Sequence, residues 1–180
     1  MRFLVATGLG GSGKTIFTDI AKELGFFVIS FGDVVREEVQ QHGLPLTTEN
    51  DRKMANWFNA NDDNMKLLVE KAIRKIPHGV STIVIDGHVT VTEVRHLKRF
   101  GDVKIVAITA PEDVRFRRLL KRGRIDTDEL NEIIEKERRE IGYGVLTVMN
   151  QADYRLDNSG ALIEFRERAL EILRDYEGEE

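Results

Sequence analysis

The chain has 180 residues, a formal net charge of −4 at pH 7 and a hydrophobic fraction of 41%. These values predict one globular domain over residues 1–180 with a sizeable core, and they argue against a broad nucleic-acid-binding surface. The absence of cysteine excludes disulfides, thiolate metal sites and cysteine nucleophiles. The first apolar run, FLVA, is too short for a signal peptide, and no stretch is long enough to span a membrane. We therefore expect a cytoplasmic protein.

Strand and helix patterns alternate along the chain. Short apolar runs such as RFLVAT predict strands, and amphipathic or charged runs between turn residues predict helices. In chain order, the expected elements are a strand at 2–7, a helix at 13–25, a strand at 26–30, a helix at 33–43, a mostly helical stretch at about 45–75, a strand at 81–86, a helix at 90–101, a strand at 103–109, helices at 111–123 and about 126–149, a strand at 154–157 and a helix at 161–176. This alternation predicts an α/β fold, in which helices cover both faces of a five-stranded parallel sheet.

The stretch GLGGSGKT lies between the first predicted strand and helix and satisfies the pattern G-x-x-x-x-G-K-[ST]. Its glycines allow backbone N–H groups to surround an anion, and the following helix N-terminus adds positive charge. Lys14 can reach the β- and γ-phosphates of a nucleotide, and the Thr15 hydroxyl can bind Mg²⁺. We therefore predict an ATP site that contains Gly8, Leu9, Gly10, Gly11, Ser12, Gly13, Lys14, Thr15 and Ile16.

A second nucleotide motif is excluded by its context. The stretch NQAD, residues 150–153, is similar to the guanine-reading N-K-x-D of GTPases, but a charged helix precedes it instead of a buried strand. The third predicted strand is followed by DGHV, where a GTPase would have D-x-x-G. We interpret NQAD as a helix end that leads into a strand, and we expect guanine nucleotides to bind no better than adenine nucleotides.

The stretch SFGDVVREE predicts part of an acceptor site. Gly32 lies at the carboxyl end of a predicted strand, Asp33 begins a helix and Arg36 follows one turn later. Ligands of open α/β sheets bind at that end of the strands. The stretch resembles the strand–turn–helix of nucleoside monophosphate kinases, and this resemblance implies that Arg36 binds the phosphate of the acceptor.

The resemblance extends over nearly the whole chain. The stretches GDVVREE, GLPLTTEN, IVIDG, RFRRLLKRGRID, RREIGYG and ADYRLDN follow one another in an order that resembles an archaeal family of adenylate-kinase-related P-loop proteins, also called predicted nucleotide kinases. This resemblance implies an adenylate-kinase-like P-loop NTPase fold, with an acceptor-side insertion at about 32–76 and a lid region at about 121–140. It also implies a kinase reaction.

Further charged residues suit phosphoryl transfer. Asp86 ends the third predicted strand and would accept a hydrogen bond from a Mg²⁺-bound water or from Thr15. Converging arginines can neutralise charge on a transferring phosphoryl group, and Arg118, Arg122 and Arg124 follow the fourth strand.

In the resembled kinases, the helix after the fourth strand leads into a flap whose far end returns another arginine, and Arg139 is the matching candidate. The alternative is a solvated charged face, which we expect for most of the neighbouring charges, including Glu137 and Glu140. In the stretch NSG, Asn158 lies where a loop could contact adenine, although asparagine is also an ordinary turn residue.

The acceptor half departs from the family pattern. Relatives typically have an arginine where this chain has Phe58, and another after the DG of the third strand, where this chain reads DGHVT. Restoring arginine at Phe58 and Val89 is expected to improve the use of a monophosphate. His88 and Thr90 can replace the missing groups only in part, because a neutral imidazole offers one donor. We expect Trp57 and Phe58 to pack the small acceptor-side insertion; the alternative is that they stack on a base.

These residues predict ATP- and Mg²⁺-dependent phosphoryl transfer to a small phosphorylated acceptor, held by Gly32, Asp33, Arg36 and His88. Two alternatives stay open. One is a kinase for a metabolite similar to dephospho-coenzyme A. The other is a nucleotide-dependent binding or regulatory ATPase with weak kinase activity, whose lid movement signals to a protein or RNA partner.

Overall fold

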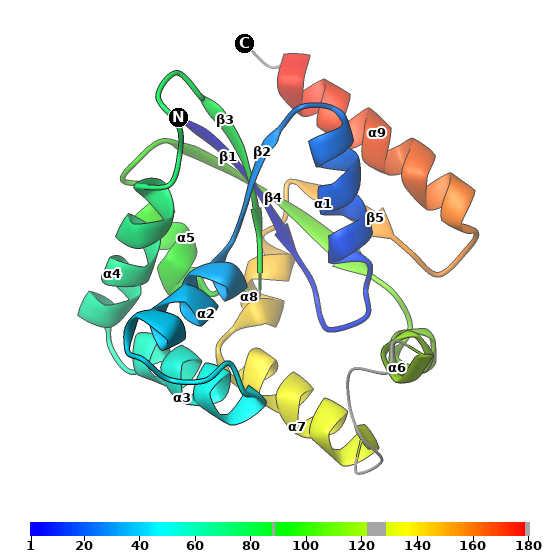
Figure 1. Ribbon diagram of the computed structural model, residues 1–180. Coiled ribbons are helices and arrows are strands. Elements are labelled where there is room, and N and C mark those ends of the chain that lie inside the picture. The colour runs from blue at the N-terminus through cyan, green and yellow to red at the C-terminus, as the bar shows by residue number, and fades with distance from the viewer. Residues whose placement is uncertain (88, 122–128, 179–180) are drawn as a thin grey trace.

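The computed structural model describes residues 1–87, 89–121 and 129–178. Within these ranges, five strands form one parallel sheet in the order β2–β3–β1–β4–β5 (Figure 1). The strands are β1 (Arg2–Thr7), β2 (Phe27–Ser30), β3 (Thr82–Asp86), β4 (Asp102–Thr109) and β5 (Tyr154–Asp157). The sheet confirms the α/β class and the five predicted strands, and it places β1 at its centre.

Helices cover both faces of this sheet (Figure 1). Their bounds are α1 (Lys14–Glu23), α2 (Phe31–Gln41), α3 (Thr48–Asn59), α4 (Asp62–Ile73), α5 (Val91–Leu97), α6 (Glu112–Lys121), α7 (Glu129–Gly142), α8 (Val145–Asn150) and α9 (Leu162–Gly178). No helix in the described ranges combines the length and the apolar character that a membrane span needs.

Two of the expected helical stretches are each divided into two helices. In the stretch at about 45–75, the side-chain oxygen of Asn61 accepts a hydrogen bond from the Asn64 backbone N–H (2.9 Å) and so begins α4 as a new helix. In the later stretch, Gly144 has a φ of 91° and separates α7 from α8. This left-handed conformation ends a helix at little cost only for a residue without a side chain.

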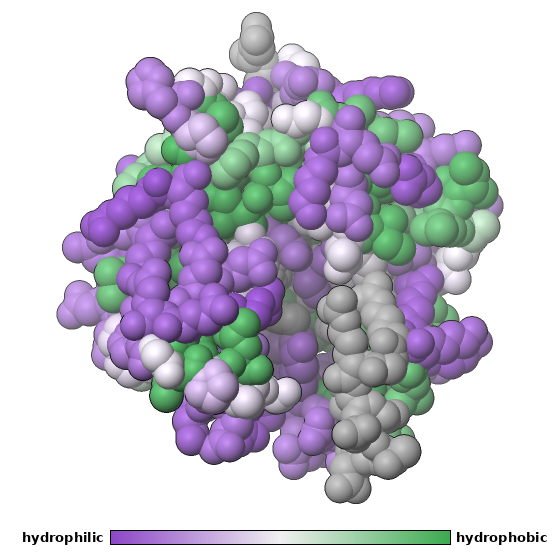
Figure 2. All heavy atoms as spheres, in the orientation of Figure 1, coloured by the Kyte–Doolittle hydropathy of each residue, from purple (hydrophilic) through white to green (hydrophobic). Residues whose placement is uncertain are grey.

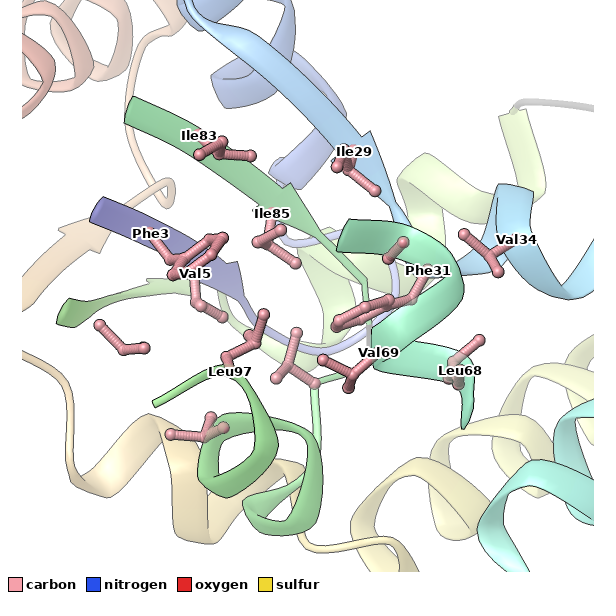
Figure 3. Packing of buried hydrophobic residues seen from close by; sticks show 14 of the residues in the cluster. Phe3, Val5, Ile29, Phe31, Val34, Leu68, Val69, Ile83, Ile85 and Leu97 are labelled. Atoms are coloured by element: carbon pink, nitrogen blue, oxygen red, sulfur yellow. The ribbon is translucent and has the colours of Figure 1, made fainter. Parts of the chain in front are cut away.

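Alternate residues of β1 contribute to two hydrophobic clusters. Phe3 and Val5 pack with residues of α4 and α5, whereas Leu4 and Ala6 pack with residues of α1 and α9. Figure 3 shows the first cluster, with Leu97 of α5 beside the strand residues. Because side chains alternate along a strand, a central strand covered on both faces must be apolar throughout. This packing fixes the position of the loop that follows β1.

A buried carboxyl group caps α5. The Glu93 carboxyl accepts a hydrogen bond from the Thr90 backbone N–H, and the Thr90 hydroxyl oxygen accepts one from the Glu93 N–H (3.3 Å). The two residues thus form a capping box at the start of α5. Burial raises the pKa of Glu93 to about 7, because the ionised form loses its hydration.

We expect the folding stability contributed by Glu93 to fall as the pH rises. The folded-state pKa lies above the unfolded value, so the contribution is complete below about pH 4.5 and is lost as the pH passes about 7. Glu93→Gln keeps the capping geometry without titrating. Over this pH window, the variant should gain about 3 kcal/mol of unfolding free energy relative to wild type. Urea denaturation of both proteins at several pH values measures this difference, and Glu171→Gln, exposed on α9, is the control. Parallel stability curves for Glu93→Gln and wild type would contradict the expectation.

Candidate functional site

The loop between β1 and α1 lies at the carboxyl edge of the central strand. Gly11 and Gly13 have φ values of 78° and 117°, in the left-handed region. A Cβ atom at Gly11 would overlap the backbone of Arg115, and one at Gly13 would overlap the amide of Asn158. Among the described residues, no side chain caps the first turn of α1. The first backbone N–H groups of α1 are therefore available to bind an anion, as the glycine pattern predicts.

Lys14 folds back over this loop. Its ammonium group donates hydrogen bonds to the carbonyl oxygens of Gly8 (2.5 Å) and Leu9 (3.2 Å). Burial lowers the pKa of Lys14, and the negative charges of Glu140 and Asp86 oppose that shift. The lysine thus lies on the predicted phosphate loop, where two carboxylates influence its charge.

Asp86 supplies a second group at the same edge of the sheet. It ends β3, opposite Ala6 of β1. Its Oδ1 atom is buried without a hydrogen-bond partner in the described part of the chain, and burial raises the pKa of this carboxyl group. Oxygen ligands of this type, together with the Thr15 hydroxyl, fit Mg²⁺ and its bound water. The orphaned oxygen therefore agrees with the predicted metal role of Asp86.

Arg118 and Asn158 connect α6 and the β5–α9 loop to the phosphate loop. The Arg118 guanidinium donates to the backbone oxygen (2.9 Å) and side-chain oxygen (3.3 Å) of Asn158, and to the Gly11 carbonyl (3.4 Å). Asn158 is 2% exposed, and its amide group donates to the Ser12 carbonyl (2.7 Å). Both residues therefore meet at the nucleotide loop, in contact with its backbone.

Arg115 is a structural residue that the sequence analysis did not identify. Its side chain is 6% exposed and donates to the carbonyl oxygens of Ala110 (3.1 Å) and Gly10 (3.2 Å). It also forms a two-point ion pair with Glu137, in which one bond measures 3.0 Å. This cluster joins α6, α7 and the phosphate loop. The sequence RFRR offers no signal that separates Arg115 from the other arginines.

Glu140 also lies against the phosphate loop. It is 5% exposed and, with Gly10, lines a small cavity of about 30 Å³. Burial raises the pKa of Glu140, whereas the positive charges of Lys136 and Lys14 and a hydrogen bond from the Gly10 backbone lower it. The expectation of a solvated charged face is therefore wrong for Glu137 and Glu140. The amphipathic pattern of α7 did not show that these residues meet a distant loop.

We expect Glu140→Gln to tighten the binding of ATP. The Glu140 carboxylate has the same sign of charge as nucleotide phosphates, and it also attracts Lys14. Removing its charge should lower the dissociation constant of ATP–Mg²⁺ about three- to tenfold, measured by titration calorimetry. Glu135→Gln, exposed on the same helix, is the matched control. Equal affinities of the Glu140 and Glu135 variants would show that the carboxylate does not oppose the nucleotide.

The structure places only part of the predicted acceptor site. Arg36 is 47% exposed and is paired with Asp33, which is 61% exposed, and Gly32 lies beside its guanidinium. Arg139 is partly buried on α7, next to Glu140. The predicted site residues His88, Arg122 and Arg124 lie outside the described residues.

Phe58 and Val89 lie in the hydrophobic core. Both are fully buried in the hydrophobic cluster on one face of the sheet, and the ring of Phe58 meets the edge of Trp57, with centroids 5.0 Å apart. An arginine at either position would carry a charge into an apolar core. This burial argues against a gain from Phe58→Arg or Val89→Arg, and we expect either variant to lose stability. The expected packing role is confirmed for Phe58, whereas Trp57 is 45% exposed.

The elements that carry these residues meet at one end of the molecule. In Figure 1, the β1–α1 loop, α3 and α7 lie at the same end of the sheet. Figure 2 shows a hollow on this face, and much of its border on the side of α2 and α3 is hydrophilic. This end is the carboxyl edge of the parallel strands, where ligands of open α/β sheets bind.

Similar solved structures have the same overall fold. The structure of TT1252 from Thermus thermophilus has a TM-score of 0.63 at 16% identity, covering 97% of this chain and 96% of that one. Shikimate kinase from Bacteroides thetaiotaomicron has a TM-score of 0.60 at 16% identity, covering 98% of each chain. Dephospho-CoA kinase from Campylobacter jejuni has a TM-score of 0.54 at 18% identity, covering 97% of each chain. These similarities establish a P-loop kinase-like fold.

Sequence relatives identify the family. An AAA domain family model matches residues 7–135. A UPF0200/UPF0201 protein of Archaeoglobus fulgidus is 37% identical over 96% of this chain, which spans 55% of that relative. A UPF0200 protein of Hyperthermus butylicus is 32% identical, over 98% of this chain and 95% of its own length. The chain therefore belongs to the UPF0200 family of archaeal P-loop proteins, with an AAA domain in a kinase-like fold.

Proposed function

We propose that this protein is a kinase that transfers the γ-phosphoryl group of ATP to a small-molecule acceptor, with Mg²⁺. One observation carries the proposal. A glycine loop with Lys14 over it lies beside the orphaned buried oxygen of Asp86, at the edge of the sheet where ligands bind. The loop is suited to binding phosphates, and the Asp86 carboxylate is suited to accepting a hydrogen bond from a metal-bound water.

Each group has a defined part in this proposal. The loop N–H groups and Lys14 hold the β- and γ-phosphates, while Thr15 and Asp86 hold Mg²⁺, the latter through water. A bound Mg²⁺ would neutralise phosphate charge. Arg118 and Arg139 neutralise charge on the transferring group, together with Arg122 and Arg124. Positioning and charge neutralisation supply most of the catalysis in such reactions.

One candidate acceptor, implied by the family resemblance, is a phosphorylated compound similar to a nucleoside monophosphate. Arg36, with Gly32, Asp33 and His88, would then hold its phosphate, between the insertion at about 32–76 and the lid at about 121–140. The dephospho-CoA kinase fold supports a related metabolite as a second candidate. A regulatory ATPase is the third candidate, because Asp33 already occupies the guanidinium of Arg36.

Labelled ATP tests the kinase directly. The protein is incubated with ATP–Mg²⁺ and each acceptor of a broad panel of metabolites, and both ADP and labelled product are measured. The proposal expects the two to form in equal amounts with at least one acceptor. ADP formation that no acceptor accelerates would favour the regulatory ATPase. A preference for GTP in competition experiments would contradict the choice of adenine nucleotide.

We expect Arg139→Gln to lower turnover more than nucleotide binding. If the guanidinium meets the phosphoryl group only in the transition state, kcat should fall about a hundredfold while the Kd of ATP stays similar. Steady-state kinetics and calorimetry measure the two quantities. Arg138→Gln is the matched control, because Arg138 is exposed on the same helix. A change confined to the Kd would assign Arg139 to ground-state binding.

A further inference from the structure

A polar pocket of about 260 Å³ opens between the acceptor-side helices, α5 and the end of α7. Its lining comes from the α3–α4 corner, from the start of α5 and from Tyr143. This volume is somewhat below that of pockets for drug-sized ligands, so the pocket suits a compact molecule.

The pocket lies at the same edge of the sheet as the phosphate loop. Thr90, in its wall, follows the last residue of β3 by four positions, and β3 is hydrogen-bonded to β1. Tyr143, in the opposite wall, follows Glu140 by three positions, about one helical turn. Because Glu140 lies against the phosphate loop, the end of α7 connects the loop to the pocket. The Tyr143 hydroxyl also donates to Asn56, which joins this wall to α3.

The lining offers both hydrogen-bond donors and acceptors. Asn59 uses its NH₂ group to bond the Ala55 carbonyl (2.9 Å), and Asn61 uses its oxygen to accept from the Asn64 N–H. Within the described ranges, the oxygen of Asn59 and the NH₂ group of Asn61 have no hydrogen-bond partner, so they are available to a ligand. Thr92 adds a hydroxyl group to the wall. A lining that offers donors, acceptors and a hydroxyl group matches the hydroxyl groups of a sugar or polyol.

The pocket carries little net charge. Among its described lining residues, the only cationic side chain is Arg95, and it is paired with Asp62. Asp62 also accepts a hydrogen bond from the buried ring of His96 (2.9 Å), an interaction that lowers the pKa of this carboxyl group. Asp62 is therefore ionised at neutral pH and carries the charge opposite to that of Arg95. This lining therefore offers no unpaired cationic side chain to a phosphate group among the described residues.

We propose that this pocket binds a small, uncharged, hydroxyl-rich compound, a sugar or polyol, as the phosphoryl acceptor; this rests on the proposed kinase function. One acceptor hydroxyl oxygen forms a bond to the γ-phosphorus of ATP. The bond from that phosphorus to the oxygen bridging it to the β-phosphate breaks, and its electron pair remains with ADP. The hydroxyl proton is released to water. Arg36 then needs no acceptor phosphate, in keeping with its pairing to Asp33.

Binding is tested first, on the full chain without nucleotide. The probes are pentoses, hexoses, linear polyols and inositol, with AMP, CMP and UMP for comparison, measured by calorimetry and by the shift in Tm. At least one neutral compound should bind, and Thr92→Val should weaken it about three- to tenfold through the loss of one hydrogen bond. Thr147→Val, exposed on α8, is the matched control and should leave binding unchanged. Absence of binding by every neutral compound would overturn the proposal.

Transfer is tested second, with ATP–Mg²⁺ and the compound that binds. Equal amounts of ADP and phosphorylated compound, with a KM raised by Thr92→Val, would support the proposal. Binding without transfer would contradict the kinase function but leave the pocket as a sugar site. Failure of the kinase function can therefore be distinguished from failure of the sugar site, which would show no binding at all. Phosphorylation of a nucleoside monophosphate with a KM that Thr92→Val does not change would overturn the assigned acceptor class.

Discussion

Replacing Lys14 with alanine is expected to abolish tight binding of ATP–Mg²⁺ or its turnover. In the loop, the Lys14 ammonium group already donates hydrogen bonds to the carbonyl oxygens of Gly8 and Leu9, and the charges of Asp86 and Glu140 raise its pKa against the effect of burial. Lys14 is therefore the cation that the phosphates of a nucleotide would contact at the β1–α1 loop. Loss of a charged group that contacts the transferring phosphoryl lowers rates by something on the order of a hundredfold or more.

Calorimetry with ATP–Mg²⁺ and an assay of ADP formation measure both effects for Lys14→Ala. Lys14→Met keeps most of the apolar stem and separates loss of charge from loss of packing. Lys22→Ala, exposed on the same helix and paired with Asp19, is the control for helix stability. Circular dichroism should show the same fold in all variants. Unchanged affinity and unchanged turnover in Lys14→Ala would refute the nucleotide site.

Replacing Arg115 with methionine is expected to destabilise the protein by about 3–5 kcal/mol, because it leaves the buried charge of Glu137 without its partner. The side chains of Arg115 and Glu137 are 6% and 13% exposed, and Arg115 also bonds the carbonyls of Ala110 and Gly10. The loss should therefore also loosen the phosphate loop. A lower affinity for ATP should accompany the lower stability.

The same helix provides a control for this prediction. Arg117 is 66% exposed and pairs with Asp113 one turn away. Arg117→Met should change the unfolding free energy by less than about 1 kcal/mol, since exposed ion pairs contribute little. The double variant Arg115→Met, Glu137→Met removes both buried charges and should recover much of the lost stability. Urea denaturation measures all four proteins. Equal losses in the Arg115 and Arg117 variants would contradict the structural role of Arg115.

Much of this fold is predictable because its determinants are local. The alternation of apolar and amphipathic runs predicted the five strands, and the strand order places the first of them at the centre. The glycine spacing of the phosphate loop, with Lys14 and Thr15, identified the site because these residues act within one short turn. The helix boundaries near Asn61 and Gly144 were missed, although both obey local capping rules.

The surroundings of each charge depend on residues far along the chain. Arg115 and Arg117 are alike in the run RFRR, yet the first reaches Gly10, 105 residues away, and the second reaches solvent. Glu140 follows the polar pattern of its helix but is buried against the same loop. The residue pattern of a single helix does not indicate which segments, far away in the sequence, its side chains will contact.

The sequence by itself determined the parallel α/β architecture and the phosphate loop, because periodicity and turn residues act over a few positions. Only the tertiary structure decided that Phe58 and Val89 belong to the core, that Glu137 pairs with Arg115 and Glu140 is buried beside Gly10, and that a polar pocket forms between α3, α4, α5 and Tyr143. The physical reason is that burial depends on which surfaces pack together. Such packing brings together segments that lie far apart in the sequence. A charged residue on a helix, such as Glu140, becomes buried only through contacts of this kind.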